Sequence, residues 1–384
     1  MMFNRSPSPI VRLAVLPALM LALHGCDGPE PLEEPLSDEA MSAVSEDAGA
    51  PRKEVARQVD DLFTKDGQGE TRALVVYANG ELAAERYADG YDAETRFVSW
   101  SMAKTVTAVM IGMLVADGRL SLDEPAPIPL WQRPGDPRGA ITLRHLLQMR
   151  SGLRHTETGD PPWESSEVRM LFLDGRDDMA HWAMEQPLEA EPGEQFEYST
   201  STTVILADIA ARALTRSTKP DDRRRAVADY LDSRLFEPLG MASIVPEFDA
   251  AGTLIGGSLM HATARDWARF GEMLRRKGRA PTGEQLVPAR WVEAMTTPSP
   301  KSPHYGFQTW LNRKQSNPKP GEVHPLFADR GPETLFYLSG HMGQYVVVSP
   351  SQRVTIVRLG HSDAEQRAVM IPELADILDL YPQR

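Results

Sequence analysis

Cysteine is almost absent from this chain, and positive charge is scarce. The 384 residues include one cysteine, Cys26, so no disulfide can form within the chain. Lysine and arginine number 41 against 54 aspartates and glutamates, which gives a net charge of −13. A broad nucleic-acid interface needs a basic face to meet the phosphates, so this charge balance argues against nucleic-acid binding.

Several motifs that carry chemistry in other proteins are also missing. The sequence contains no Gly-x-Ser-x-Gly, no Gly-rich phosphate loop, and no His-x-x-x-His or Cys-x-x-Cys spacing. We therefore expect no metal ion and no cofactor, and no nucleophile elbow of the α/β-hydrolase type. No periodic motif predicts a solenoid.

The N-terminus has the pattern of an export signal. Arg5 and Arg12 precede an apolar stretch, Leu13–Leu23, which is too short to span a bilayer comfortably. The stretch ends in Gly25-Cys26 and resembles a bacterial lipoprotein signal, although His24 departs from the usual small residue. This predicts a signal peptide over residues 1–25, a lipid anchor at Cys26, and a location on the periplasmic face of the bacterial cell envelope. An ordinary export signal and an inner-membrane anchor are the alternatives.

An acidic segment follows the cysteine. Residues 27–50 carry eight aspartates and glutamates and no basic residue, together with prolines and small residues. Such a composition buries too little apolar area to fold by itself. We therefore predict a flexible tether over residues 26–54 and one folded domain over residues 55–384.

The folded domain has strand patterns at both ends and helix patterns between them. Asn79-Gly80 separates two strand-like runs and predicts a tight hairpin. Three more β-rich runs lie between residues 333 and 360. Helices are expected at 98–117, 142–151, 203–214, 226–235, 264–274 and 373–380. The order predicts an α+β fold in which an antiparallel sheet and a helical lobe enclose one cleft.

Ser101 and Lys104 are the first candidate catalytic pair. In a helix, residues three apart lie on one face about one turn apart. Met102 takes the corresponding position for Ser99, so only Ser101 has the lysine beside it. Burial and the positive end of the helix dipole both predict a lowered Lys104 pKa. A partly neutral lysine could then accept the serine proton.

The pair alone is a weak signal. A lysine at a helix start can also extend its ammonium group to solvent. A second Ser-x-x-Lys occurs at Ser316–Lys319, but Pro318 excludes helical spacing there.

Five segments together resemble a known family. They are SWSMAK, ITLRHLLQMRSGL, EPGEQFEYST, TARDWARFG and SGHMGQYVVV, in that order from residue 99 to residue 348. The set is similar to the serine hydrolases of the β-lactamase and penicillin-binding-protein superfamily, in its class C-like branch, which includes family esterases and 6-aminohexanoate-dimer hydrolases. The resemblance implies a β-lactamase-like fold with the active site in the cleft, Ser101 as nucleophile and Lys104 as its base.

The resemblance also assigns a second motif, Tyr198-Ser-Thr200. Tyr198 would shuttle protons, and Thr200 stands where the family has a substrate-binding asparagine. Tyr77–Asn79 matches the motif literally, but it precedes the serine and forms the hairpin turn. A half-buried loop tyrosine with no catalytic part is the alternative for Tyr198.

The third motif is His341-Met-Gly343. His341 would replace the family's lysine, Gly343 would let substrate approach a strand edge, and the Gln344 N–H would face the acyl oxygen. A strand-end histidine without a ligand is the alternative for His341.

The sequence as a whole predicts an exported serine hydrolase that cleaves a small-molecule ester, amide or lactam through an acyl-enzyme on Ser101, with a substrate that is not a typical β-lactam. A non-catalytic cell-wall or ligand-binding module is the rival hypothesis, because the second and third motifs depart from the family. The oligomeric state stays open.

Overall fold

The computed structural model describes residues 35–313, 326–327 and 330–384. The predicted signal peptide, Cys26 and the second Ser-x-x-Lys at Ser316–Lys319 lie outside these residues. Within the described ranges, no helix has the length and apolar character needed to cross a membrane.

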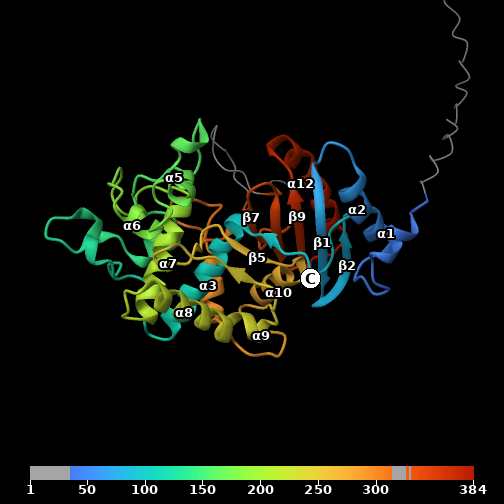
Figure 1. The fold of residues 1–384 in the computed structure, drawn as a ribbon. Helices are drawn as coiled ribbons and strands as arrows, with labels where there is room; N and C mark the ends of the chain where they lie inside the picture. The colour runs from blue at the N-terminus through green and yellow to red at the C-terminus, as the bar shows by residue number, and fades with distance from the viewer. Residues whose placement is uncertain (1–34, 314–325, 328–329) are drawn as a thin grey trace, which may run out of the picture. The chain divides into compact units, whose positions relative to one another are not determined.

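A six-stranded antiparallel sheet forms one part of the structure. Its spatial order is β2-β1-β9-β8-β7-β6, so β1 pairs with the last strand, β9, and the strands from both ends of the domain form one sheet, as predicted (Figure 1). The strands are β1 (Glu70–Ala78), β2 (Glu81–Tyr87), β6 (Trp310–Leu311), β7 (Phe336–Gly340), β8 (Gln344–Ser349) and β9 (Val354–His361).

The hairpin between β1 and β2 forms at Asn79-Gly80. Ala78 pairs with Glu81 across the turn, and Asn79 and Gly80 have φ angles of 55° and 96°. Positive φ at both positions matches the right-handed twist of the strands, and this explains why these two residue types stand here.

The two faces of the sheet bury alternate residues. On β1, Leu74 and Val76 face a core formed with α2 (Arg52–Thr64) and α12 (Ala364–Asp379). Ala73 and Val75 face the opposite way, toward α10 (Ala264–Arg275) and the main core. The period of two in these strands therefore places the sheet between helical layers.

The helical lobe lies between β2 and β6 in the sequence, and Figure 1 shows α5–α8 grouped together, with α3 beside them. Helix α3 contacts α7 and is buried on every face, which explains its lack of charge after Lys104. A three-stranded sheet of order β3-β5-β4 lies beside it. The remaining elements are α1 (Asp38–Ser42), β3 (Phe97–Val98), α3 (Ala103–Ala116), α4 (Leu143–Leu147), α5 (Ser166–Phe172), α6 (Met179–Met184), α7 (Thr200–Leu214), α8 (Pro220–Leu231), α9 (Glu237–Leu239), β4 (Val245–Pro246), β5 (Met260–Ala262) and α11 (Ala289–Met295).

The predicted tether differs from the structure in its second half. Residues 38–42 form α1, Val44 bridges to Ala84 of β2, and Val44 and Ala48 are buried against the sheet. The acidic composition of the segment concealed these few apolar contacts. The packed unit begins at Leu36 rather than at Val55.

Other differences concern the ends of helices. The predicted helix 98–117 is a short strand, a 3₁₀ turn at Trp100–Met102 and then α3. The last helix begins at Ala364, before Pro372, because the side chains of Asp363 and Gln366 cap its first turn. The predicted helices at 203 and 226 begin earlier, at Thr200 and Pro220.

Candidate active site

Ser101 lies in the 3₁₀ turn that joins β3 to α3. The neighbouring Ser99 is fully buried, and its hydroxyl accepts the Met260 N–H at 3.1 Å, which ties the turn to β5. Trp100 has a positive φ of 44°, a strained conformation for a bulky residue. Ser101, by contrast, lines a cavity of about 530 Å³. The structure therefore gives Ser99 a structural role and presents Ser101 to a ligand.

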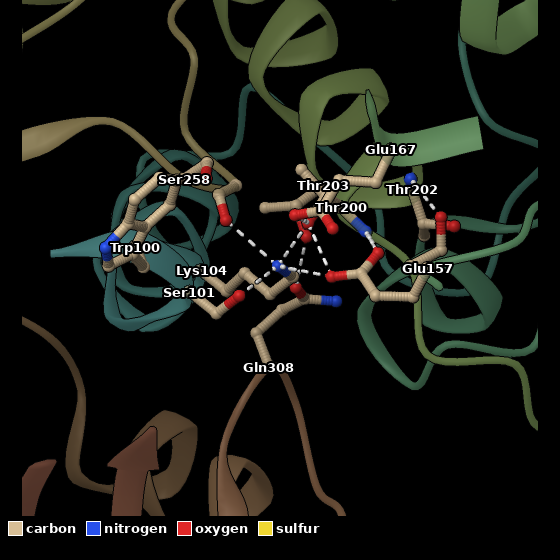
Figure 2. A network of polar contacts seen from close by, with 12 residues as sticks. Trp100, Ser101, Lys104, Glu157, Glu167, Thr200, Thr202, Thr203, Ser258 and Gln308 are labelled. Carbon is tan, nitrogen blue, oxygen red and sulfur yellow. Dashed lines mark hydrogen bonds and ion pairs between the residues drawn. The ribbon is translucent and has the colours of Figure 1, made fainter. Parts of the chain in front are cut away.

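Lys104 is the polar centre beneath Ser101. Its side chain is 1 % exposed, and its Nζ donates to Ser101 Oγ at 2.9 Å, to Thr200 Oγ1 at 2.7 Å and to the Gly257 carbonyl at 2.9 Å. Figure 2 shows these contacts converging on Nζ from the 3₁₀ turn before α3, from α7 and from the segment before β5. The predicted spacing thus brings serine and lysine together, with the lysine facing inward.

The predicted lowering of the Lys104 pKa is wrong. Burial acts to lower the pKa, but the electrostatic interactions with Tyr198, Glu157 and Glu167 outweigh burial and raise it. Glu157 Oε1 lies 3.5 Å from Nζ. Lys104 therefore rests as an ammonium ion that is paired inside the protein.

Two glutamates of the site were missed by the sequence analysis. Glu157 lies in the loop before α5, and Glu167 lies in the first turn of α5. Both line the cavity with Ser101. Burial, and then the charge of Glu157, raises the pKa of Glu167 to about 7. No sequence motif marks this pair, because the loop and the helix meet only through the packing of α5 against α7.

Tyr198 precedes the N-terminus of α7 and lines the same cavity. Its ring centroid lies 4.8 Å from Lys104 Nζ and 5.0 Å from the ring of Trp310. Burial raises the pKa of its phenol, although Lys104 and Ser101 act to lower it. Tyr198 is therefore a neutral phenol that can donate one proton and accept another.

Thr200 does not stand where a substrate-binding residue would. It is fully buried at the start of α7, and its hydroxyl contacts Glu157 Oε1 at 2.7 Å and Glu167 Oε1 at 3.1 Å. Its backbone N–H donates to Glu157 Oε2 at 2.6 Å. The predicted substrate contact is thus replaced by a contact with the lysine and the two carboxylates behind the cavity.

The third motif lies in the turn between β7 and β8. His341 lines the cavity, and its ring meets Trp100 edge-on at 5.4 Å between centroids. Partial burial, and then the positive charges of Arg367 and His361, lowers the pKa of His341. The imidazole is therefore neutral at pH 7.

The structure gives Gln344 and Gly343 other roles than those predicted. Gln344 is buried, and its side-chain amide donates to the carbonyls of Gly360 at 2.6 Å and His341 at 3.1 Å, which holds the turn. A Cβ on Gly343 would meet Arg358, away from the serine. These contacts do not test the role of the Gln344 backbone N–H, which stays a prediction.

Gly340 is the glycine that matters for access to Ser101. A Cβ at this position would lie 2.4 Å from the Ser99 carbonyl oxygen, so only glycine lets β7 approach the serine turn so closely. Ser339, Gly340 and His341 all line the cavity. Ser339-Gly340 at the end of a strand was the sequence signal for this position.

The residues that line the cavity include two groups from different parts of the chain. We call Glu157, Glu167 and Tyr198 the acidic wall, and Ser339, Gly340, His341 and Arg367 the sheet wall. Among the residues described, no group of three histidine, cysteine, aspartate or glutamate side chains is placed to hold a metal ion.

Comparisons with known proteins agree with this architecture. A buried Ser-x-x-Lys pair at the head of a helix, between an antiparallel sheet and a helical lobe, defines a β-lactamase-like fold with a serine-hydrolase site. The family model named Beta-lactamase matches residues 57–379, and the chain belongs to that family.

One sequence relative is the 6-aminohexanoate-dimer hydrolase of Paenarthrobacter ureafaciens. It is 25% identical over 256 residues, which cover 63% of this chain and 61% of the relative. The match therefore spans less than two thirds of that relative's length.

Solved structures show the same fold. A Bacillus anthracis protein, itself named only as a candidate 6-aminohexanoate-dimer hydrolase, aligns with a TM-score of 0.65 at 22% identity over 85% of this chain and 83% of that one. A family VIII carboxylesterase aligns with a TM-score of 0.60 at 16% identity over 84% and 96% of the two chains. An octameric penicillin-binding protein homologue from Pyrococcus abyssi aligns with a TM-score of 0.58 at 19% identity over 85% and 77%.

Proposed function

We propose that this protein is a serine hydrolase that cleaves small linear esters or amides through an acyl-enzyme on Ser101. The observation that carries the proposal is the contact of 2.9 Å between Ser101 Oγ, at the cavity surface, and the fully buried Nζ of Lys104. A serine so close to a lysine has a base within reach for its proton.

The reaction follows from the positions of the groups. Ser101 Oγ attacks the substrate carbonyl carbon and passes its proton to Lys104 Nζ in its amine form. The oxyanion forms between the serine turn and β7, where the backbone N–H groups of Ser101 and His341 are the candidate donors. Tyr198 then relays the proton from Lys104 to the leaving group, and a water molecule releases the acyl group by the same steps in reverse.

The cavity favours small substrates with separated polar ends. Its volume of about 530 Å³ is in the range of small-molecule sites. Glutamates lie on one wall, and a neutral histidine and Arg367 lie on the other. A relative named as a 6-aminohexanoate-dimer hydrolase and a structural neighbour named as a carboxylesterase support amides and esters as substrate classes.

A substrate comparison tests the proposal. We expect purified residues 36–384 to hydrolyse p-nitrophenyl butyrate with a higher kcat/KM than nitrocefin, because His341 brings no charge for the carboxylate of a lactam. The Ser101→Ala variant is the control and should be inactive on both. A nitrocefin kcat/KM above about 10⁶ M⁻¹s⁻¹, well within the range of efficient enzymes, would instead make the protein a β-lactamase. No turnover of any ester, amide or lactam would favour the non-catalytic module.

We also propose that the protein is exported and anchored by a lipid at Cys26. The support is the n-region, the apolar stretch and the Gly-Cys junction in the sequence. Labelled palmitate should enter the full-length protein in a bacterial host, and Cys26→Ala should abolish the labelling. Equal partition of both proteins into detergent would contradict the lipid anchor and favour an uncleaved signal anchor.

A further inference from the structure

The proposed reaction needs Lys104 as an amine, whereas three acceptors around Nζ and the nearby carboxylate of Glu157 favour an ammonium ion. Its proton must therefore leave before Ser101 can be activated. Ser101 Oγ and the Gly257 carbonyl cannot hold that proton permanently, because one is the nucleophile and the other is a neutral acceptor. The third partner, the hydroxyl of Thr200, lies closest, at 2.7 Å.

Thr200 joins the lysine to both glutamates. Its Oγ1 accepts from Lys104 Nζ and lies 2.7 Å from Glu157 Oε1 and 3.1 Å from Glu167 Oε1 (Figure 2). A hydroxyl has one hydrogen to give and two lone pairs to receive with. Thr200 can therefore take a proton from the lysine while it gives its own to either carboxylate.

We propose that Thr200 and the Glu157–Glu167 pair form a proton relay. The relay converts Lys104 from an ammonium ion to the amine that activates Ser101, and this inference rests on the proposed hydrolase function. One proton passes from Lys104 Nζ to Thr200 Oγ1, and the hydroxyl hydrogen of Thr200 passes to Oε1 of Glu167. An ammonium and a carboxylate become an amine and a carboxylic acid, so the net charge does not change. Ser101 then gives its own proton to Nζ as Oγ bonds to the carbonyl carbon.

The surroundings of the relay make this transfer feasible. Lys104 is 1 % and Glu157 is 18 % exposed, and the backbone N–H of Thr200 fixes the other oxygen of Glu157 at 2.6 Å. Burial disfavours charge on Lys104 and on Glu167 alike. A buried ion pair that becomes a neutral pair no longer carries the cost of two desolvated charges. The three residues act through Lys104 and are positioning residues.

The relay predicts a pH dependence. Lys104 and Glu157 are the charged groups that face Glu167, and His341 and Arg367 lie on the sheet wall. The raised pKa of Glu167, about 7, is close to the best value for a proton acceptor at neutral pH. Below pH 7 Glu167 already holds a proton and cannot take another. Above pH 7 it is free to accept, so activation of Ser101 should rise with pH with a midpoint near 7.

The rate of Ser101 labelling by a fluorophosphonate tests the relay without knowledge of the substrate. The rate is measured on the folded protein by intact mass from pH 5.5 to 9. We expect the wild-type rate to rise through a midpoint near pH 7. Glu167→Gln should remove this rise and slow labelling at pH 8 by about 10²-fold, within the usual contribution of a proton-transfer group. Thr200→Val should slow labelling similarly, and Thr200→Ser, which keeps the hydroxyl, should restore it.

Glu164→Gln is the matched control. Glu164 is exposed, lies three residues before Glu167, and does not line the cavity. Its substitution should leave the rate and the midpoint unchanged. If wild type is labelled but Glu167→Gln and Thr200→Val keep its rate and midpoint, the relay is wrong and the hydrolase function stands. If wild type is not labelled at any pH, the hydrolase function is wrong and the relay with it.

Discussion

The acidic wall of the cavity depends on a buried network of polar side chains, whereas the sheet wall depends on a close approach of the backbone. Behind the acidic wall, Lys104 and Thr200 form a buried network with Glu157, in which the three side chains satisfy one another. On the sheet wall, the backbone of β7 meets the serine turn through a glycine, and the side chains of His341 and Arg367 face the open cavity. One wall therefore supplies proton transfer, and the other supplies space, backbone donors and charge for the substrate.

The largest expected effect comes from removing Lys104, the buried cation that pairs with the acidic wall. Lys104→Ala should lower turnover of p-nitrophenyl butyrate by about 10²–10⁴-fold, the usual contribution of a general base. Because the charge of Glu157 then lacks its partner, unfolding free energy should fall by about 2–4 kcal/mol. This loss of stability is expected because Lys104 has a raised pKa and is paired with a carboxylate. Removal of a lysine with a lowered pKa would have left folding largely intact.

Enzyme kinetics and urea unfolding check this prediction. Lys277→Ala is the control, because Lys277 forms an exposed surface pair with Glu293. Near-normal turnover in Lys104→Ala would remove Lys104 from the mechanism.

On the sheet wall, we expect a substitution at Gly340 to lower activity most. In Gly340→Ala the added Cβ forces β7 away from Ser99, which misplaces the backbone donors for the oxyanion. We expect kcat to fall by about 10²-fold, comparable to the loss of one oxyanion donor. Met342→Ala, in the same turn, should stay near wild type. An active Gly340→Ala with unchanged kcat would show that the approach of β7 does not shape the site.

The charge of the sheet wall should discriminate between substrates. Arg367→Ala should lower kcat/KM for nitrocefin, which carries a carboxylate, by about 10-fold, since a hydrogen bond to a charged group contributes about 1.5–3 kcal/mol. His341→Lys should act in the opposite direction. Neither variant should change kcat/KM for p-nitrophenyl butyrate by more than about twofold. If both substrates respond alike, these side chains do not contact the carboxylate.

The smallest expected effect concerns Glu167 on the acidic wall and the dependence of the unfolding free energy on pH. The folded protein raises the pKa of Glu167 from 4.5 to about 7, so folding favours its protonated form. The resulting stabilisation is present below pH 4.5 and is lost as pH rises through 7. Glu167→Gln should therefore reduce the fall in unfolding free energy between pH 5 and 8.5 by on the order of 1–2 kcal/mol. An unchanged pH dependence in urea unfolding would contradict the buried protonated state.

The sequence predicted the sheet wall's strands and the serine–lysine pair, because both depend on local spacing. The hairpin at Asn79-Gly80 and the three-residue offset of Ser101 and Lys104 follow from φ preferences and helical geometry. The relation of Lys104 to Glu157 and Glu167 could not be predicted in this way, because the glutamates lie 53 and 63 positions further on and no motif marks them.

Sequence spacing also does not show which side chains pack into the interior, and this explains the other differences between the predicted and the observed structure. Thr200 and Gln344 carry residue types that suit ligand binding, and only the packing of α7 and of the β7–β8 turn shows that they face inward. The buried apolar residues of 36–54 are too few to be visible against the acidic side chains around them, eight of which lie in residues 27–50.

The most direct test is whether Ser101 carries the acyl group during turnover. The protein is mixed with p-nitrophenyl butyrate, quenched in acid during the steady state, digested and analysed by mass spectrometry. Our account predicts one butyryl group on the peptide that contains Ser101, and neither the adduct nor turnover in Ser101→Ala. Undiminished hydrolysis by Ser101→Ala, or a butyryl group on another residue in the wild type, would contradict it.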